Sequence, residues 1–70
     1  MGFNEKYRVI LVDENGRKKE RDVYGRDLRS AHDVAQKVVE DGESKCVEIY
    51  HGSALVAELN NGRTYWYDGV

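Results

Sequence analysis

Apolar residues recur between Ser30 and Gly42 at the spacing that lines one face of an α-helix. The segment reads SAHDVAQKVVEDG, and its apolar residues at i, i+3, i+4, i+7 and i+8 are Ala31, Val34, Ala35, Val38 and Val39. Ser30 followed by Asp33 resembles a capping box, and a start one turn earlier, at Asp27 and Leu28, is the alternative. Gly42 suits the left-handed residue that ends a helix. Because the stripe consists of small and β-branched residues, it predicts a helix packed on a sheet.

Five segments around this helix are predicted as strands. Their ranges and sequences are 6–13 (KYRVILVD), 17–24 (RKKERDVY), 46–51 (CVEIYH), 54–59 (ALVAEL) and 63–67 (RTYWY). The first segment is apolar on both faces, which is typical of a central strand. The second is mostly charged, and only its turn and its partner indicate a strand. Lysines and arginines on such a strand are typical of a sheet edge, where they discourage a foreign chain from pairing.

Three short turns set the expected pairing of the strands. Asn15-Gly16 and Asn61-Gly62 predict two-residue hairpin loops, because a type I′ turn needs positive φ at both central residues, and Gly52-Ser53 predicts a third tight turn. Counting outward from these loops gives the expected partners Tyr7–Tyr24, Ile10–Arg21, Val12–Lys19, Asp13–Lys18, Glu14–Arg17, Cys46–Leu59, Glu48–Ala57, Ile49–Val56, Tyr50–Leu55, Val56–Tyr67, Ala57–Trp66 and Leu59–Thr64. The first hairpin then places two acid–base pairs beside its loop, which supports that register.

The order of these elements, ββαβββ, predicts a single small α+β domain over residues 1–70. The strand order 2-1-3-4-5 is favoured, in a mostly antiparallel five-stranded sheet with the helix packed on one face. The alternative places the third strand parallel beside the second, because a helix returns the chain to the other end of the sheet and permits either arrangement. The absence of proline and of a Gly/Ser-rich stretch argues against an internal linker.

The composition bears on the compartment and the stability of the chain. A single cysteine, Cys46, cannot form an internal disulfide, and no Cys/His cluster offers a zinc site. We therefore expect a core that contributes roughly 3–5 kcal/mol, or stability gained by self-association. Met1–Asn4 leads directly into a charged strand, so no signal peptide is expected, and no apolar run reaches the length of a membrane span. These features predict a cytoplasmic protein without a membrane partner.

The expected register makes both faces of the last three strands apolar. One face collects Cys46, Tyr50, Leu55, Ala57, Leu59 and Trp66, and the other collects Val47, Ile49, Ala54, Val56, Tyr65 and Tyr67. A helix roughly ten ångström wide covers only two or three strands. We therefore expect part of this apolar surface to remain exposed, and large exposed apolar patches mark interfaces.

This surplus of apolar surface predicts a non-enzymatic binding or accessory module. We expect the chain to form a homodimer, or to bind a protein partner, through the uncovered sheet face or the last strand. The candidate interaction residues are Tyr65, Trp66, Tyr67, Val56 and Ile49.

Nucleic-acid binding through the charged second strand is the alternative hypothesis. On a strand, Arg17, Lys19 and Arg21 project together, and Arg8 can join them, so that a basic ribbon follows a phosphate backbone. The net charge of −2 offers no general attraction to nucleic acid. Aromatic residues of the last strand can stack bases, but the glycine–aromatic pattern of an RNA-recognition motif and its βαββαβ order are both absent.

Catalytic and cofactor-binding patterns are missing from the sequence. His32 and His51 have no serine, cysteine or carboxylate at a spacing that predicts a triad, and Cys46 is expected to be a small buried hydrophobe. The seven glycines fall at the N-terminus, the turns, the helix exit and the C-terminus, and none forms a phosphate loop. No catalytic residue, metal site, cofactor or small-molecule ligand is therefore predicted, and no family motif is identified.

Overall fold

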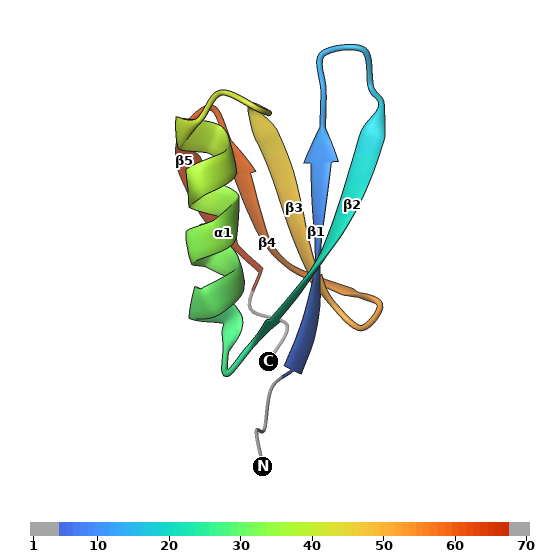
Figure 1. The fold of residues 1–70 in the computed structure, drawn as a ribbon, viewed down its shortest axis with the longest axis vertical. Coiled ribbons are helices and arrows are strands. Elements are labelled where there is room, and N and C mark those ends of the chain that lie inside the picture. Colours follow the sequence, from blue (N-terminus) through green and yellow to red (C-terminus); the bar gives the residue numbers. More distant parts are fainter. Residues whose placement is uncertain (1–4, 68–70) are drawn as a thin grey trace.

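A five-stranded antiparallel sheet and one helix along one side of it make up the two layers of the structure (Figure 1). The computed structural model describes residues 5–67. Along the chain, the elements are β1 (Glu5–Val12), β2 (Lys18–Gly25), α1 (Leu28–Glu40), β3 (Cys46–His51), β4 (Ala54–Asn60) and β5 (Arg63–Trp66). The strand order is β2-β1-β3-β4-β5, and neighbouring strands are antiparallel throughout. The predicted α+β fold and strand order are confirmed, and the parallel alternative is wrong.

The structure bears on the prediction that no membrane span is present, but not on the prediction that no signal peptide is present. Within residues 5–67, no helix is long and apolar enough to cross a membrane. The prediction about a signal peptide concerns Met1–Asn4, which lie outside the described residues.

Helix α1 starts at Leu28, two residues earlier than the expected Ser30. Asp27 is the N-cap, and its Oδ1 atom accepts hydrogen bonds from the Ser30 amide at 3.3 Å and from the Ser30 hydroxyl at 3.5 Å. The earlier of the two possible starts is therefore the observed one, because Asp27 supplies the capping acceptor and Ser30 is bonded to it within the first turn. At the other end, Gly42 has φ 77°, and the amides of Gly42 and Glu43 donate to two carbonyls of the last turn at 3.1 Å each. This is a Schellman ending.

The first hairpin closes with a three-residue loop rather than the expected two-residue one. Asp13 shapes this loop, since its carboxylate accepts hydrogen bonds from the amides of Asn15 at 2.9 Å and Arg17 at 2.8 Å. The Asp13 carbonyl also accepts from the amide of Gly16 at 3.0 Å, and Gly16 is the residue of this loop with positive φ, at 81°. The expected register is wrong by one residue, so the β2 side chains face the opposite way relative to β1. The observed partners include Tyr7–Val23, Arg8–Asp22, Val9–Arg21, Ile10–Glu20, Leu11–Lys19 and Val12–Lys18.

A β-bulge at Val56 shifts the register between β3 and β4. Tyr50 faces Leu55 as expected, but Ile49 faces Ala57 because β4 has one extra residue there. The expected pairs Cys46–Leu59, Glu48–Ala57 and Ile49–Val56 are wrong, and the observed ones are Cys46–Asn60, Val47–Leu59, Glu48–Glu58 and Ile49–Ala57. The second Asn-Gly turn has positive φ at both residues, 54° and 81°, as a two-residue type I′ turn requires. The pairs that it predicts, Ala57–Trp66 and Leu59–Thr64, are confirmed.

The apolar core lies between the sheet and α1. Buried side chains of α1 meet buried side chains of the central strands, and this cluster contains Ala31, Ala35, Val38, Tyr7, Val9, Leu11, Val47, Ile49, Ala57 and Leu59. The α1 backbone packs against β1, β2, β3 and β4, while β5 lies beyond it. One edge of the sheet is therefore left without a helix above it.

The bulge also decides which residues face away from α1. We call this side of the sheet the open face, and its central residues are Arg8, Ile10, Glu20, Glu48, Tyr50, Leu55, Glu58, Tyr65 and Tyr67. The expected grouping of Ala57 and Leu59 with Tyr50 and Leu55 is wrong, because the extra residue on β4 exchanges the two sides. The open face carries charged side chains among its apolar ones. The expected second apolar face is therefore reduced to the neighbourhood of β5.

Candidate interaction surface

Strand β5 presents three aromatic side chains to solvent at the edge of the sheet. Tyr65 is 46% exposed, Trp66 54% and Tyr67 43%. The strand follows directly from the Asn61-Gly62 turn and, within the described residues, it pairs with β4 alone. These residues include three of the five candidates predicted from the sequence, and the structure brings them together.

The three aromatic residues divide between the two faces of the sheet. Tyr65 lies opposite Glu58 on the open face, and Tyr67 lies on the same face, where its hydroxyl donates to Glu58 Oε1 at 2.8 Å. This hydrogen bond is the main reason that the pKa of Tyr67 is raised above its ordinary value. Trp66 faces the side of α1, and its ring lies 4.9 Å from the ring of His32. A strand added at this edge would thus meet aromatic side chains above and below it.

His32 connects α1 to β5 without covering it. Its Nε2 atom lies 2.9 Å from the hydroxyl oxygen of Thr64, and its ring is tilted by 37° against that of Trp66. No local sequence pattern indicates this contact, because 32 residues separate His32 from Thr64. The contact holds the helix side of β5 in place and leaves about half of Trp66 exposed.

The outer backbone groups of β5 are those of Thr64 and Trp66. Hydrogen bonds alternate along an antiparallel pair, so every second residue of an edge strand directs its N–H and C=O away from the sheet. The Tyr67 amide donates to the Val56 carbonyl at 3.0 Å, which fixes the phase of this alternation. Residues 63, 65 and 67 therefore bond to β4. Thr64 and Trp66 offer two donors and two acceptors at the free edge.

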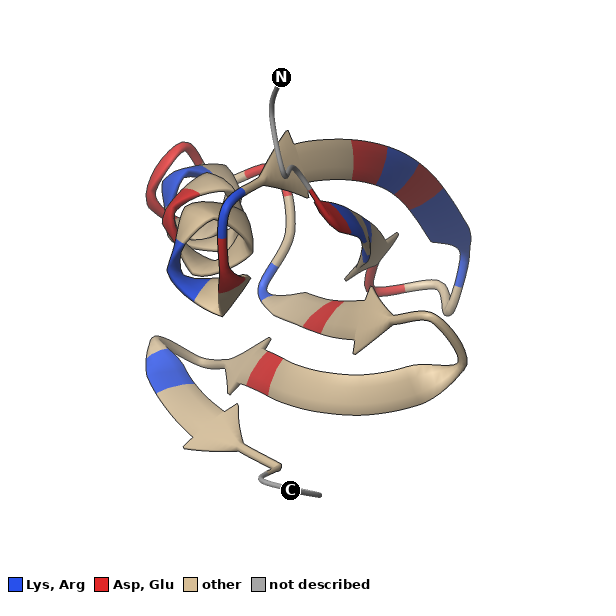
Figure 2. Ribbon diagram, turned by 90° about the horizontal axis from the view of Figure 1, so that it is seen from below, with Lys and Arg blue, Asp and Glu red and all other residues tan. Residues whose placement is uncertain are grey.

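The other edge of the sheet, β2, differs from β5 in charge. Figure 2 shows positive and negative residues alternating along β2, whereas β5 carries a single positive residue at its start. The charged residues of β2 are Lys18, Lys19, Glu20, Arg21 and Asp22. An added strand would have to match this pattern or leave charges unpaired, so a charged edge resists pairing. Within residues 5–67, β5 is therefore the edge with fewer charged side chains to oppose pairing.

Two carboxylates on the open face lie close to β5. Glu48 and Glu58 are cross-strand partners, and a tyrosine hydroxyl donates to each of them, from Tyr50 at 3.3 Å and from Tyr67 at 2.8 Å. Like charges directly opposite each other destabilise a sheet. Among residues 5–67, neither Glu48 nor Glu58 takes part in an ion pair, and the same holds for Arg63. A cation is therefore electrostatically favoured beside β5.

The two remaining candidates of the predicted interaction face lie beneath the surface. Ile49 has an exposed fraction of 0% and belongs to the core under α1. Val56 is half-buried at the bulge and packs against that core. Ile49 is therefore unable to contact a partner, and Val56 can do so only at the margin of β5. The bulge that buries them is not visible in the hydrophobic pattern.

The structure does not assemble the four predicted basic residues. Lys19 and Arg21 point to the side of α1, Arg17 ends the first hairpin loop, and Arg8 lies on the open face. Arg8 is 3.9 Å from Glu20 and lies 5.4 Å above the ring of Tyr50. The expected contact of Arg8 with the basic strand residues is wrong, because the one-residue change of register turns β2 over relative to β1.

Arg21 is further neutralised by an acidic residue of the loop after α1. Its Nη2 atom lies 2.7 Å from Glu43 Oε1, and its Nη1 atom is 3.4 Å from Glu43 Oε2. The hydrogen bond from Arg21 lowers the pKa of Glu43 below its ordinary value. Arg21 is thus already engaged, which reduces the positive charge that β2 can offer to a phosphate.

Elsewhere in the described part of the chain, the side chains that could act as catalytic groups or metal ligands either contact a neighbouring residue or stand alone. His51 Nε2 lies 2.7 Å from Glu5 Oε1, and its ring stacks on Tyr7 at 4.8 Å. Cys46 is free and half-buried on the open face, rather than fully buried as expected. Among residues 5–67, no three His, Cys, Asp or Glu side chains are close enough together to hold a metal ion.

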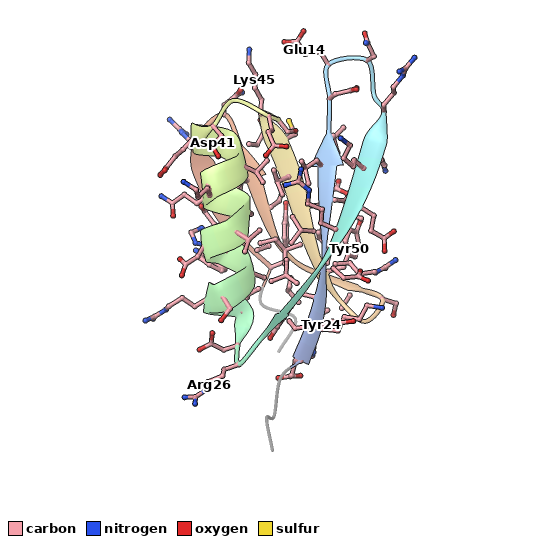
Figure 3. The ribbon with its side chains drawn as sticks, viewed as in Figure 1. Glu14, Tyr24, Arg26, Asp41, Lys45 and Tyr50 are labelled. Carbon is pink, nitrogen blue, oxygen red and sulfur yellow. The ribbon has the colours of Figure 1, made fainter. Side chains whose placement is uncertain are left out.

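A surface hollow of about 450 Å³ lies at the end of the molecule where α1 leads into β3. Glu14 and Lys45 stand at this end (Figure 3), and their charged groups are 3.9 Å apart. The hydroxyl of Ser44, which also lines the hollow, lies 2.7 Å from one backbone carbonyl and 2.8 Å from another. The hollow is open to solvent. The Ser44 hydroxyl connects the loop after α1 to β1 and β3.

Comparison of the chain with protein-family models, with curated proteins and with solved structures finds no significant match. The geometry of β5 and of the side chains around it is therefore the basis on which a function can be inferred.

Proposed function

We propose that this chain is a non-enzymatic binding or accessory module, and that β5 is the strand through which it binds another polypeptide. The partner extends the sheet by one strand, a mode of recognition in which backbone hydrogen bonds supply affinity and alternate side chains supply specificity. The observation that carries the proposal is the outward N–H and C=O groups of Thr64 and Trp66, flanked by exposed aromatic residues on both faces. Tyr65 and Tyr67 flank the added strand on the open face, and Trp66 flanks it on the side of α1.

The size of the exposed aromatic surface predicts the strength of this binding. A large aromatic residue buries roughly 150–250 Å² when fully covered, so three that are about half exposed offer roughly 300 Å² on one partner. Stable complexes bury at least about 1,000 Å² in total. We therefore expect a transient complex, with a dissociation constant in the micromolar range or above. Such affinity suits an accessory role.

The compartment in this proposal is the cytoplasm. Cys46 is unpaired, and the small domain relies on its packed core rather than on disulfides. Small secreted domains of this size are commonly disulfide-dense, because their cores are thin. The cysteine usage supports a reducing environment.

Photo-crosslinking in living cells tests whether β5 is the interaction strand, whatever the partner. The photoreactive residue p-benzoylphenylalanine replaces Tyr65 in one variant and Glu20 in the other. Both positions are exposed on the open face, but Tyr65 lies on the β5 edge and Glu20 on the charged β2 edge. We expect discrete adducts from position 65 and few from position 20, and mass spectrometry identifies them. Equal adduct yields at the two positions would refute the proposal.

Nucleic-acid binding through β2 remains the alternative function, with less support from the arrangement of its cations. Arg21 is bonded to Glu43, and Arg8 lies on the opposite face of the sheet from Lys19. The alternative predicts salt-sensitive binding to single- or double-stranded probes that Lys19→Glu with Arg21→Glu abolishes. Fluorescence anisotropy of labelled single- and double-stranded probes at low salt tests this alternative. We expect no change in the anisotropy of either probe.

A further inference from the structure

We propose that the polypeptide bound by β5 is a second copy of this chain, and that the two β5 strands pair antiparallel with Tyr65 facing Tyr65 across a two-fold axis. This inference rests on the function proposed above and names the partner of the same strand. The two sheets would join into one continuous sheet whose outer edges are the two charged β2 strands.

The register follows from the backbone groups that β5 leaves unpaired. Two identical antiparallel strands can pair Thr64 with Thr64, Trp66 with Trp66, or Thr64 with Trp66 in both directions. Within residues 63–67, each of the first two registers joins one pair of outward residues and makes two hydrogen bonds. The third joins both pairs and makes four. The third register centres the axis on Tyr65, and it alone pairs the outward groups of Thr64 and Trp66 entirely within residues 63–67.

The same register places complementary side chains next to each other. On the side of α1, Trp66 of each copy lies opposite Thr64 of the other, next to the place where His32 contacts Thr64. On the open face, the two Tyr65 rings face each other, and aromatic cross-strand pairs stabilise sheets. The exposed aromatic surface of one copy is thus covered by that of the other.

Charge supports a second copy over a neutral strand. Within residues 5–67, neither Arg63 nor Glu58 takes part in an ion pair. In the Tyr65-centred register, Arg63 lies opposite Tyr67 of the other copy, whose hydroxyl donates to its own Glu58. Strand spacings place the Cα atoms of Arg63 and that Glu58 about 12 Å apart, within the combined reach of the two side chains. The two-fold symmetry produces this contact between Arg63 and Glu58 twice.

Symmetry also argues for β5 on β5 rather than β5 on β2. A two-fold pairing of identical edges closes on itself, while pairing β5 with β2 would leave one β5 and one β2 edge that can repeat the same contact and so build open filaments. The alternating charges of β2 would then lie against the aromatic residues of β5 without partners. The charged β2 strand therefore limits assembly to a dimer.

Sedimentation equilibrium of the purified chain tests the dimer. Because the aromatic surface is small, we expect monomer at about one micromolar and mostly dimer at several hundred micromolar. Thr64→Pro removes one outward N–H from each copy, and proline is tolerated at a sheet edge where its nitrogen faces solvent. Thr64→Val is the matched control, since it keeps the N–H and loses only the hydroxyl. We expect dimerisation at least tenfold weaker for Thr64→Pro than for Thr64→Val, with the circular dichroism of both unchanged.

Disulfide trapping tests the register in a Cys46→Ser background. Directly opposed residues in a pair without mutual hydrogen bonds have Cα atoms about 4.5 Å apart, so Tyr65→Cys is expected to form a covalent dimer under mild oxidation. The control is Arg63→Cys, whose two copies would lie about 14 Å apart along the strands, too far for a disulfide. Equal trapping of both variants, or a native chain that stays monomeric at millimolar concentration, overturns the inference. If crosslinks from position 65 in cells then lead to another protein, the proposed function survives and only the second copy is excluded.

Discussion

Replacing Gly25 with alanine would test the packing between the end of β2 and the start of α1. Gly25 is buried, and a Cβ atom built on it lies 2.4 Å from Ser30 Cβ and 2.7 Å from Ser30 Oγ. Gly25 is absent from the positions with positive φ, so its backbone suits alanine and the cost of the substitution is steric. The Cβ of Ser30 is attached directly to the helix backbone. Relief of the contact therefore requires β2 and α1 to move apart.

The expected cost is large for a domain of this size. Overpacking a well-packed site typically costs about 1–3 kcal/mol, and the lower flexibility of alanine in the unfolded chain offsets about 0.4–1 kcal/mol of this. We expect Gly25→Ala to lower the free energy of unfolding by about 1–2 kcal/mol. One kcal/mol shifts the melting temperature of a domain with 60–100 residues by roughly 4–8 °C. The melting temperature should therefore fall by roughly 5–15 °C.

A second substitution separates this contact from other causes. Ser30→Gly removes both clashing atoms, and the nearest remaining atom, Ser30 Cα, is 3.8 Å from the added Cβ. Alone, Ser30→Gly costs about half a kcal/mol through lower helix propensity. In the double variant the alanine side chain has room. The double variant should therefore lose about 1 kcal/mol less stability than the sum of the losses of the two single variants.

Urea unfolding followed by far-ultraviolet circular dichroism measures these differences. The chain should be kept at low micromolar concentration, so that self-association does not contribute to the measured stability. The slope of the unfolding free energy against urea concentration should stay the same among the variants, since each exposes the same amount of surface on unfolding. Two results would contradict the packing described here: a Gly25→Ala variant within 0.5 kcal/mol of the native chain, or additive losses in the double variant.

Three further outcomes are expected from the hydrogen bonds of the structure. Ser44→Ala should cost about 0.5–1.5 kcal/mol in urea unfolding, because it removes a buried hydroxyl whose one proton is donated to the backbone carbonyl of Val12 or Cys46. The pKa of Glu43 is lowered by Arg21, so this pair stabilises the fold above the ordinary Glu pKa and is lost as pH falls through the lowered value. Arg21→Gln should raise the carboxyl pKa of Glu43, as measured by NMR. It should also weaken the dependence of the unfolding free energy on pH in the acid range. Conversely, the raised pKa of Tyr67 gives a contribution that is present below the ordinary tyrosine pKa and lost as pH rises through the raised value. Glu58→Gln should therefore lower the pKa of Tyr67, as followed by tyrosinate absorbance, and an unchanged pKa would exclude the hydrogen bond between them.

The exposed aromatic strand could be predicted from the sequence more reliably than the faces around it. Tyr65, Trp66 and Tyr67 follow an Asn-Gly turn near the end of the sequence, so a position at the sheet edge follows from the strand order. Ile49 could not be placed correctly in the same way. Its face depends on the bulge at Val56, which is set by the packing of two strands against α1 rather than by a local sequence signal.

The elements, their order along the chain and the second Asn-Gly turn are consequences of local sequence patterns. Helical periodicity, β-branched segments and the φ > 0 requirement of a type I′ turn are local properties, and they operate before distant parts of the chain meet. The registers of the first hairpin and of β3 with β4 are visible only in the structure. In the first hairpin, Asp13 accepts two amides and makes the loop at Asn15-Gly16 three residues long, while Asn61-Gly62 forms the two-residue loop. A side-chain period of two makes every such one-residue choice exchange the faces of a strand, so the composition of each face depends on contacts that form only when the sheet assembles.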